Sequence, residues 1–163
     1  MNAGTLSSFD GEAINDLYLS IAQNGVAFNN LGYEFNMDKD AVLSDFDFLL
    51  ENADFKGVYK KIKRVFTKKC KSFIEDPRMI LPCSALIASY LLDPYGNIYP
   101  CTIWNRKIGN IHESSFNYVW TSEQAKETRK MIKQELCPIC WSGCESSHCI
   151  LQNLHRVVGD FLT

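Results

Sequence analysis

Four cysteines stand within the 13-residue segment CPICWSGCESSHC, which is far denser than the background frequency of this residue. Their spacing is C-x2-C-x3-C-x4-C, formed by Cys137, Cys140, Cys144 and Cys149. Two more, Cys83 and Cys101, stand upstream with seventeen residues between them. Because thiolates bind zinc and iron, this density of thiols indicates a metal site.

The spacing of these cysteines favours an iron–sulfur cluster over zinc. Structural zinc sites often contain two C-x2-C pairs, or one such pair with two closely spaced histidines. This sequence has one C-x2-C pair, and its His148 and His155 are seven residues apart. Iron–sulfur clusters commonly take four cysteine ligands, which separate chain segments can supply.

The segment between Cys83 and Cys101 predicts a β-hairpin. Two short segments, 88–92 and 97–101, flank the turn sequence DPYGN. Proline presets the backbone of such a turn, and Gly96 supplies a positive φ at little steric cost. The ends of antiparallel strands are neighbours, so we expect Cys83 and Cys101 to come close enough to share one metal centre.

The chain downstream of this hairpin predicts elements that lead to the cysteine-rich segment. Gly109-Asn110 is typical of a turn, and a short helical stretch follows it. Thr121-x-x-Gln124 is a capping-box pattern, which predicts that a second helix covers residues 122–136. This helix would deliver the chain to the four clustered thiols.

The first 69 residues contain no cysteine and predict a different kind of unit. Residues 16–22 alternate as a β-strand does, and Asn24-Gly25 marks a turn after them. Residues 45–50 and 55–66 have helical patterns. One strand and two helices cannot cover each other's apolar faces alone, so this half reads as the remnant of a repeating β/α unit.

The second of these helices carries many basic residues between positions 56 and 71. Val58, Ile62, Val65 and Phe66 fall on one apolar face of it, and the basic residues are interpreted as its solvated face. A nucleic-acid surface is not expected, because the formal net charge of the chain is −2.

The composition is that of a folded protein, and the sequence pattern leads us to expect reduced thiols. It has 46% hydrophobic and 22% charged residues, as globular proteins do. No apolar run approaches the roughly 18 residues that span a bilayer, and the sequence shows no secretory signal. We therefore expect a cytoplasmic location and no membrane partner. There, a group of cysteines more often binds metal than forms disulfides.

Five features follow one another in a fixed order: Cys83-x12-Gly96-x4-Cys101, the segment DPYGNIYPC within it, IGNI, a short helix ending in Trp, and a C-x2-C pair. This order resembles the SPASM/twitch region of radical S-adenosylmethionine enzymes. The resemblance implies one or two auxiliary [4Fe–4S] clusters. It also implies an α+β fold with two domains. Residues 1–75 would be the last β/α elements of a partial barrel, and residues 76–163 would be a small cysteine-rich domain of a β-hairpin plus helices.

The resemblance also implies a set of ligands. The first assignment is one [4Fe–4S] cluster, held by Cys83, Cys101, Cys137 and Cys140. Cys144 and Cys149 are secondary candidates, for a second or incompletely ligated cluster. Two clusters with four cysteine ligands each would need eight, and the chain has seven including Cys70. We expect Cys70, at the end of a predicted helix, to be an ordinary thiol.

The resemblance implies a function within a larger radical enzyme. The sequence lacks the C-x3-C-x2-C motif that holds the cofactor-cleaving cluster in such enzymes, so we expect no S-adenosylmethionine cleavage by this chain alone. A missing N-terminal radical half or a partner chain would supply that step. The present chain would help bind a peptide or protein substrate and would take up or pass on an electron. The alternative is a non-catalytic zinc- or peptide-binding module.

Overall fold

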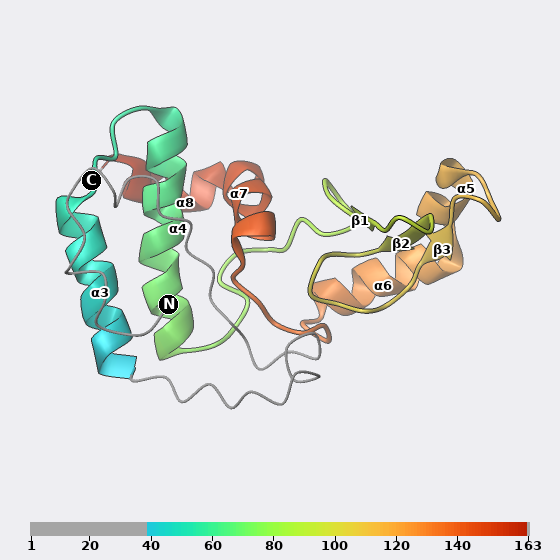
Figure 1. The fold of residues 1–163 in the computed structure, drawn as a ribbon, viewed down its shortest axis with the longest axis horizontal. Coiled ribbons are helices and arrows are strands. Elements are labelled where there is room, and N and C mark those ends of the chain that lie inside the picture. Colours follow the sequence, from blue (N-terminus) through green and yellow to red (C-terminus); the bar gives the residue numbers. More distant parts are fainter. Residues whose placement is uncertain (1–38, 163) are drawn as a thin grey trace.

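The structure of the protein is a computed structural model that describes residues 39–162. Helices α3 (Lys39–Asn52) and α4 (Val58–Glu75) lie side by side at one end of the molecule, and α7 (Gly143–Gln152) and α8 (Leu154–Leu162) pack against α4 (Figure 1). A small sheet and helices α5 (Phe116–Thr121) and α6 (Glu123–Lys133) form the other end (Figure 1). Helices and a small antiparallel sheet make the fold α+β, as predicted.

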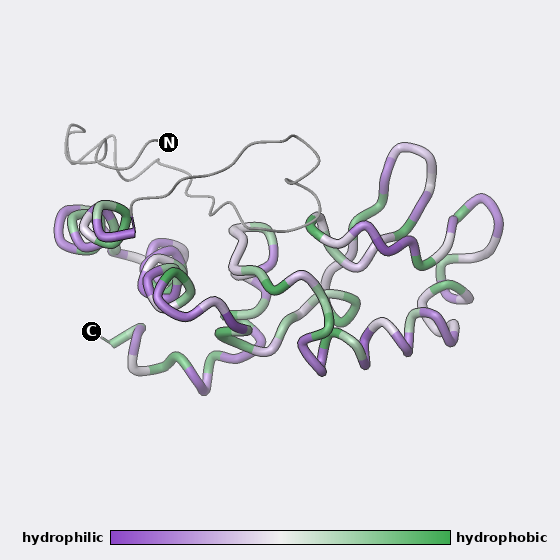
Figure 2. The backbone as a smooth tube through the Cα atoms, turned by 90° about the horizontal axis from the view of Figure 1, so that it is seen from below, coloured by the Kyte–Doolittle hydropathy of each residue, from purple (hydrophilic) through white to green (hydrophobic). Residues whose placement is uncertain are grey.

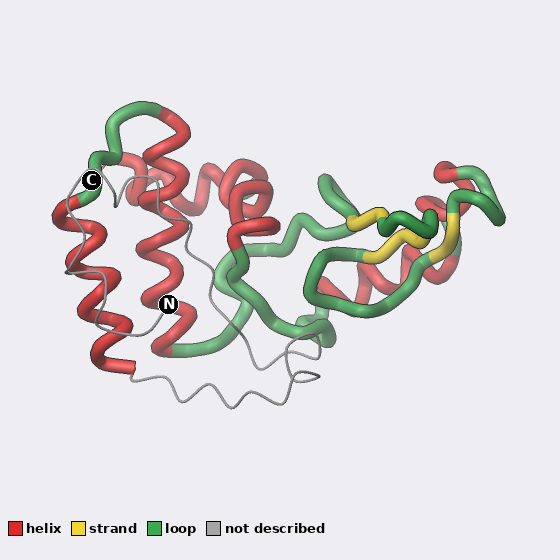
Figure 3. Tube along the Cα trace, in the orientation of Figure 1, coloured by secondary structure: helices red, strands yellow, loops and turns green. Residues whose placement is uncertain are grey.

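The sheet consists of three short antiparallel strands in the order β1-β2-β3. Their bounds are Leu91–Leu92, Asn97–Tyr99 and Gly109–Asn110. In the first pair Leu91 lies opposite Tyr99, and in the second Asn97 lies opposite Asn110. Loops connect this sheet to α4 and connect α6 to α7, so the cysteine-bearing segments are largely loops (Figure 3).

The turn between β1 and β2 is stabilised by the carboxylate of Asp93. Asp93 Oδ1 accepts hydrogen bonds from the backbone N–H groups of Tyr95 at 2.9 Å and Asn97 at 2.8 Å. Gly96 has a φ of 80°, a conformation that residues with a side chain rarely adopt. The sequence DPYGN therefore directs a tight reversal that leads β2 toward Cys101.

The turn predicted at Gly109-Asn110 is wrong, because these two residues form strand β3. The Asn110 side chain is buried, and its Nδ2 donates to Tyr95 O and to Asn97 Oδ1, both at 2.9 Å. A Cβ on Gly109 would lie 2.7 Å from a Val119 methyl group, so glycine allows α5 to pack closely on the strand. Contacts distant in sequence therefore decide the conformation of this dipeptide.

The apolar face predicted for α4 is correct except at its first residue. Val65 and Phe66 are buried and Ile62 packs against them, but Val58 is 75% exposed. Val58 is the first residue of the helix, directly after Gly57, and no element among residues 39–162 covers it. Figure 2 shows hydrophobic and hydrophilic residues together around α3 and α4, which is the pattern of helices that are covered on one side.

Basic residues of α4 are paired with surface carboxylates. Lys60 Nζ lies 2.9 Å from Asp54 Oδ2, and Lys69 Nζ lies 3.0 Å from Asp160 Oδ2 on α8. Such partly exposed pairs each contribute about 0–1 kcal/mol to stability. Several side chains of this basic run therefore have partners within the chain itself.

Helix α6 begins one residue later than the capping-box prediction requires. Ser122 is the N-cap residue, and its Oγ accepts a hydrogen bond from the Ala125 N–H at 3.2 Å. Thr121 ends α5 instead, and Gln124 Nε2 donates to Lys107 O at 2.7 Å. Two short helices meet at this point, and Ser122 is the C-cap of one and the N-cap of the other.

Two hydrophobic cores hold these elements. The helical core combines residues of α3, α4, α7 and α8 with Leu81 and Trp141, and the sheet core combines residues of the sheet, α5 and α6 with Ala85 and Leu86. Cys83 packs against both cores.

The strand predicted at 16–22 and the turn at 24–25 lie outside the described residues, so the barrel remnant and the two-domain division stay predictions. None of the helices described is long and apolar enough to cross a bilayer.

Candidate metal centre

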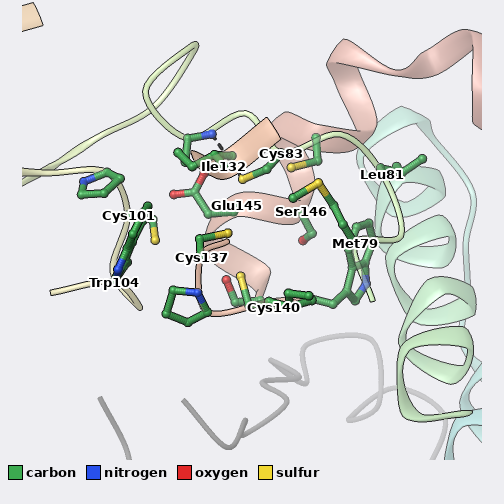
Figure 4. Close-up of a pocket in the computed structure, with 17 residues that line it drawn as sticks. Met79, Leu81, Cys83, Cys101, Trp104, Ile132, Cys137, Cys140, Glu145 and Ser146 are labelled. Atoms are coloured by element: carbon green, nitrogen blue, oxygen red, sulfur yellow. Dashed lines mark hydrogen bonds between the residues drawn. The ribbon is translucent and has the colours of Figure 1, made fainter. Parts of the chain in front are cut away.

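A cavity where the two cores meet is lined by five of the seven cysteines, including all four of the first assignment. They are Cys83, Cys101, Cys137, Cys140 and Cys149. Figure 4 shows the labelled cysteines around one common space. Its empty volume is about 550 Å³, which includes the open solvent at its mouth.

Different elements bring these thiols to the cavity. Cys83 precedes a tight loop in which the backbone N–H of Leu86 donates to Ser89 O at 2.8 Å. Cys101 follows β2 and Pro100. The chain reverses after α6 at Glu135, which has a φ of 59°, and so directs Cys137 and Cys140 to the cavity.

Cys149 reaches the cavity on α7. It is four residues after Glu145, so both side chains lie on the same face of this helix, and both line the cavity. The sequence ranked Cys149 among the secondary ligands, and the structure places it beside Cys83. Because the i, i+4 spacing is readable in the sequence, predicting a helix over residues 143–152 would have indicated this position.

Cys83 and Cys149 form a hydrogen-bonded pair of thiols. The bond from Cys83 lowers the pKa of Cys149 to about 7, and Ser84, whose Oγ is 3.4 Å from Cys149 Sγ, adds to this effect. The pKa of Cys83 is raised, because its proton is engaged in the bond to Cys149 and its side chain is largely buried. The Ala85 N–H also donates to Cys83 Sγ at 3.4 Å. Donors that converge on sulfur favour thiolates, the form that binds metal.

Cys101, Cys137 and Cys140 form a second group of thiols. Burial raises the pKa of all three, and that of Cys140 reaches about 12. The charge of Cys101 raises the pKa of Cys137 and of Cys140 further, which shows that these thiols are near one another. Without a cation, three thiolates would repel each other in this cavity, and a bound metal would remove that cost.

The donor set of this cavity fits an iron–sulfur cluster. Sulfur ligands from several segments surround a space with apolar walls, which include Met79, Leu81, Trp104 and Ile132. Among residues 39–162, no three Cys, His, Asp or Glu side chains converge as ligands of one metal ion. In a multi-iron cluster each cysteine binds a different iron atom, so its ligands surround a volume.

Cys70 and Cys144 do not line the cavity. Cys70 lies inside α4 with no exposed surface, and burial raises the pKa of its thiol strongly. Cys144 is exposed in the first turn of α7. His148 is exposed as well. The assignment of individual cysteines as ligands stays a prediction.

The tryptophans contribute mainly to packing. Trp141 is buried, stacks on Phe66 with ring centroids 6.0 Å apart and donates from Nε1 to Phe66 O at 3.0 Å. Trp120 packs edge-on against Tyr90. Trp104 forms part of the cavity wall. The aromatic rings of Trp104 and Trp141 therefore help to exclude water from the cavity.

Glu145 and two serines belong to the site, although no sequence pattern indicated them. Glu145 lines the cavity and is 6% exposed. Its Oε2 accepts hydrogen bonds from Ser89 Oγ at 2.6 Å and from Ser84 Oγ at 3.4 Å. An acidic residue in the first turn of a short helix would ordinarily be expected at the surface.

Comparison with known proteins gives one match. Residues 83–145 match the family model of the SPASM iron–sulfur cluster-binding domain. Searches of curated proteins and of solved structures returned no significant match. The matched residues include Cys83, Cys101, Cys137 and Cys140, four of the thiols that line the cavity. Residues 83–145 are therefore similar to the SPASM domain, which that family model describes as an iron–sulfur cluster-binding domain.

Proposed function

We propose that this cavity binds one [4Fe–4S] cluster and that the protein is the auxiliary-cluster region of a radical S-adenosylmethionine enzyme. The observation that carries the proposal is the set of five thiols around one largely apolar cavity within and beside the SPASM domain. Cys83, Cys101, Cys137 and Cys140 are the proposed ligands. When bound, the cluster would take up or pass on one electron.

The residues of the chain have distinct roles in this proposal. The thiols bind iron, the Ala85 N–H donates to Cys83 Sγ and stabilises its thiolate form, and the Ser84 hydroxyl lies 3.4 Å from Cys149 Sγ. Met79, Leu81 and Trp104 limit the access of water. Hydrogen bonds to sulfur and solvent exposure both affect the potential of such a cluster, so these residues would also influence its redox behaviour.

Anaerobic reconstitution tests this proposal directly. Wild-type protein should bind about four iron and four sulfide per chain and should turn brown. Iron, acid-labile sulfide and zinc are measured on the same desalted sample. A zinc content near one per chain with no iron would overturn the proposal and favour a zinc- or peptide-binding module.

The wider enzymatic role requires a second component. The C-x3-C-x2-C motif is absent from these 163 residues. We propose that a radical half or a partner chain provides it and that the substrate is a peptide or protein. The iron-loaded chain with dithionite should not release 5′-deoxyadenosine from S-adenosylmethionine. Product release that depends on this chain alone would contradict this division of roles.

A further inference from the structure

Glu145 places a carboxylate at the wall of the proposed cluster site. Its side chain is 6% exposed, although ionised side chains are seldom buried to this extent unless they are paired. In the view of Figure 4, Glu145 lies between Cys101 and Cys83. Its negative charge therefore lies close to both groups of thiols.

The contacts of Glu145 leave its charge largely uncompensated. Ser89 Oγ at 2.6 Å and Ser84 Oγ at 3.4 Å both donate to the same atom, Oε2. The ion pairs in the described part of the chain involve other carboxylates, and none of them includes Glu145. Two neutral hydroxyl donors stabilise a carboxylate, but they do not cancel its charge.

The charge of Glu145 acts on thiols from both groups. Burial raises the pKa of Cys101, and the negative charge of Glu145 adds to this rise. The bond from Cys83 lowers the pKa of Cys149, and Glu145 opposes that shift. Glu145 thus lies within electrostatic reach of sulfurs on both sides of the cavity, where little water screens its charge.

We propose that Glu145 is a positioning residue that holds the reduction potential of the bound cluster low. Reduction by dithionite adds one electron, and thus one negative charge, to the cluster, with no bond formed or broken in the protein. A carboxylate beside the cluster makes that added charge less favourable, and a change of local charge shifts the potential of such clusters. The hydroxyl of Ser89 moderates this effect by stabilising the carboxylate. This inference rests on the cluster proposed above.

Redox titration of the reconstituted protein tests this inference with two variants whose midpoint potentials should shift in opposite directions. Glu145→Gln keeps the size of the side chain and removes its charge, so the midpoint potential should rise. Ser89→Ala removes the 2.6 Å donor and leaves the charge less compensated, so the potential should fall. Glu145→Asp keeps the charge, so its midpoint potential should remain below that of Glu145→Gln. A purely structural role would not produce shifts in opposite directions.

Glu135→Gln is the matched control. Glu135 is an exposed carboxylate whose charge reaches a cavity thiol, Cys137, but water screens it. Its substitution should change the potential much less than Glu145→Gln does. Iron and sulfide are measured in every variant, so that potentials are compared only between equally loaded proteins.

The outcomes separate this inference from the proposed function. If wild-type protein assembles no cluster, the proposed function fails and this inference fails with it. If wild-type and Glu145→Gln load equally and share one potential, only the role of Glu145 is overturned. If Glu145→Gln does not hold a cluster, Ser89→Ala decides: a lower potential supports the role, and an unchanged or higher potential refutes it.

Discussion

Cys101→Ala and Cys140→Ala should each abolish stable binding of the iron–sulfur cluster. Both thiols line the cavity, and their charges interact there. Removing one of four thiolate ligands leaves an iron atom without its protein ligand, and the fifth thiol of the cavity, Cys149, is engaged with Cys83. Iron and sulfide contents after anaerobic reconstitution should fall from about four per chain to near background in each variant.

Cys70→Ala is the control for these two variants. Cys70 is a buried thiol as well, but it lies in α4 within the helical core and does not line the cavity. Its substitution should cost on the order of 1 kcal/mol in stability, because it leaves a small void, and it should leave the iron content unchanged. Equal loss of iron in all three variants would show that the ligand assignment is wrong. Full iron content in Cys101→Ala would show the same.

The sequence predicted those parts of the fold that depend on local backbone chemistry. The turn from Asp93 to Asn97 forms because Gly96 accepts a positive φ and Asp93 accepts nearby N–H groups, all within five consecutive residues. Strand β3 was missed, because Gly109-Asn110 has the composition of a turn. Its pairing with β2 and its packing against Val119 depend on contacts that a local pattern does not contain.

In the candidate site, as in the fold, the sequence predicted only the features that a local pattern contains. The density and spacing of the cysteines indicated a metal centre, because closely spaced thiols are typical ligands of zinc and iron. Glu145 could not be found in this way, because its burial depends on the loop from Ser84 to Ser89 folding over α7. Ala85 and Leu86 of that loop belong to the sheet core, and the neighbouring Cys83 packs against both cores.

Removal of the cluster should loosen the SPASM domain and leave the helical core protected. The strands of the sheet are two or three residues long, and sheets of this size are marginal without further support. The proposed ligands come from the Cys83 loop, the end of β2 and the segment between α6 and α7, so the cluster would connect three separate parts of the domain. In small domains of this kind, metal binding contributes directly to folding.

Hydrogen exchange before and after removal of iron with ferricyanide and a chelator measures this effect segment by segment. Amide protons of β1, β2 and α6 should exchange at least about tenfold faster without the cluster, the change that ~1.4 kcal/mol produces. Amide protons of α4 should change much less, because Val65, Phe66 and Phe73 are buried in a core whose only cavity thiols are Cys83 and Cys149. Helix α4 therefore serves as the internal control in the same sample. Unchanged protection in the sheet would mean that the domain folds without its metal, and an equal loss of protection in α4 would mean that the two cores unfold as one unit.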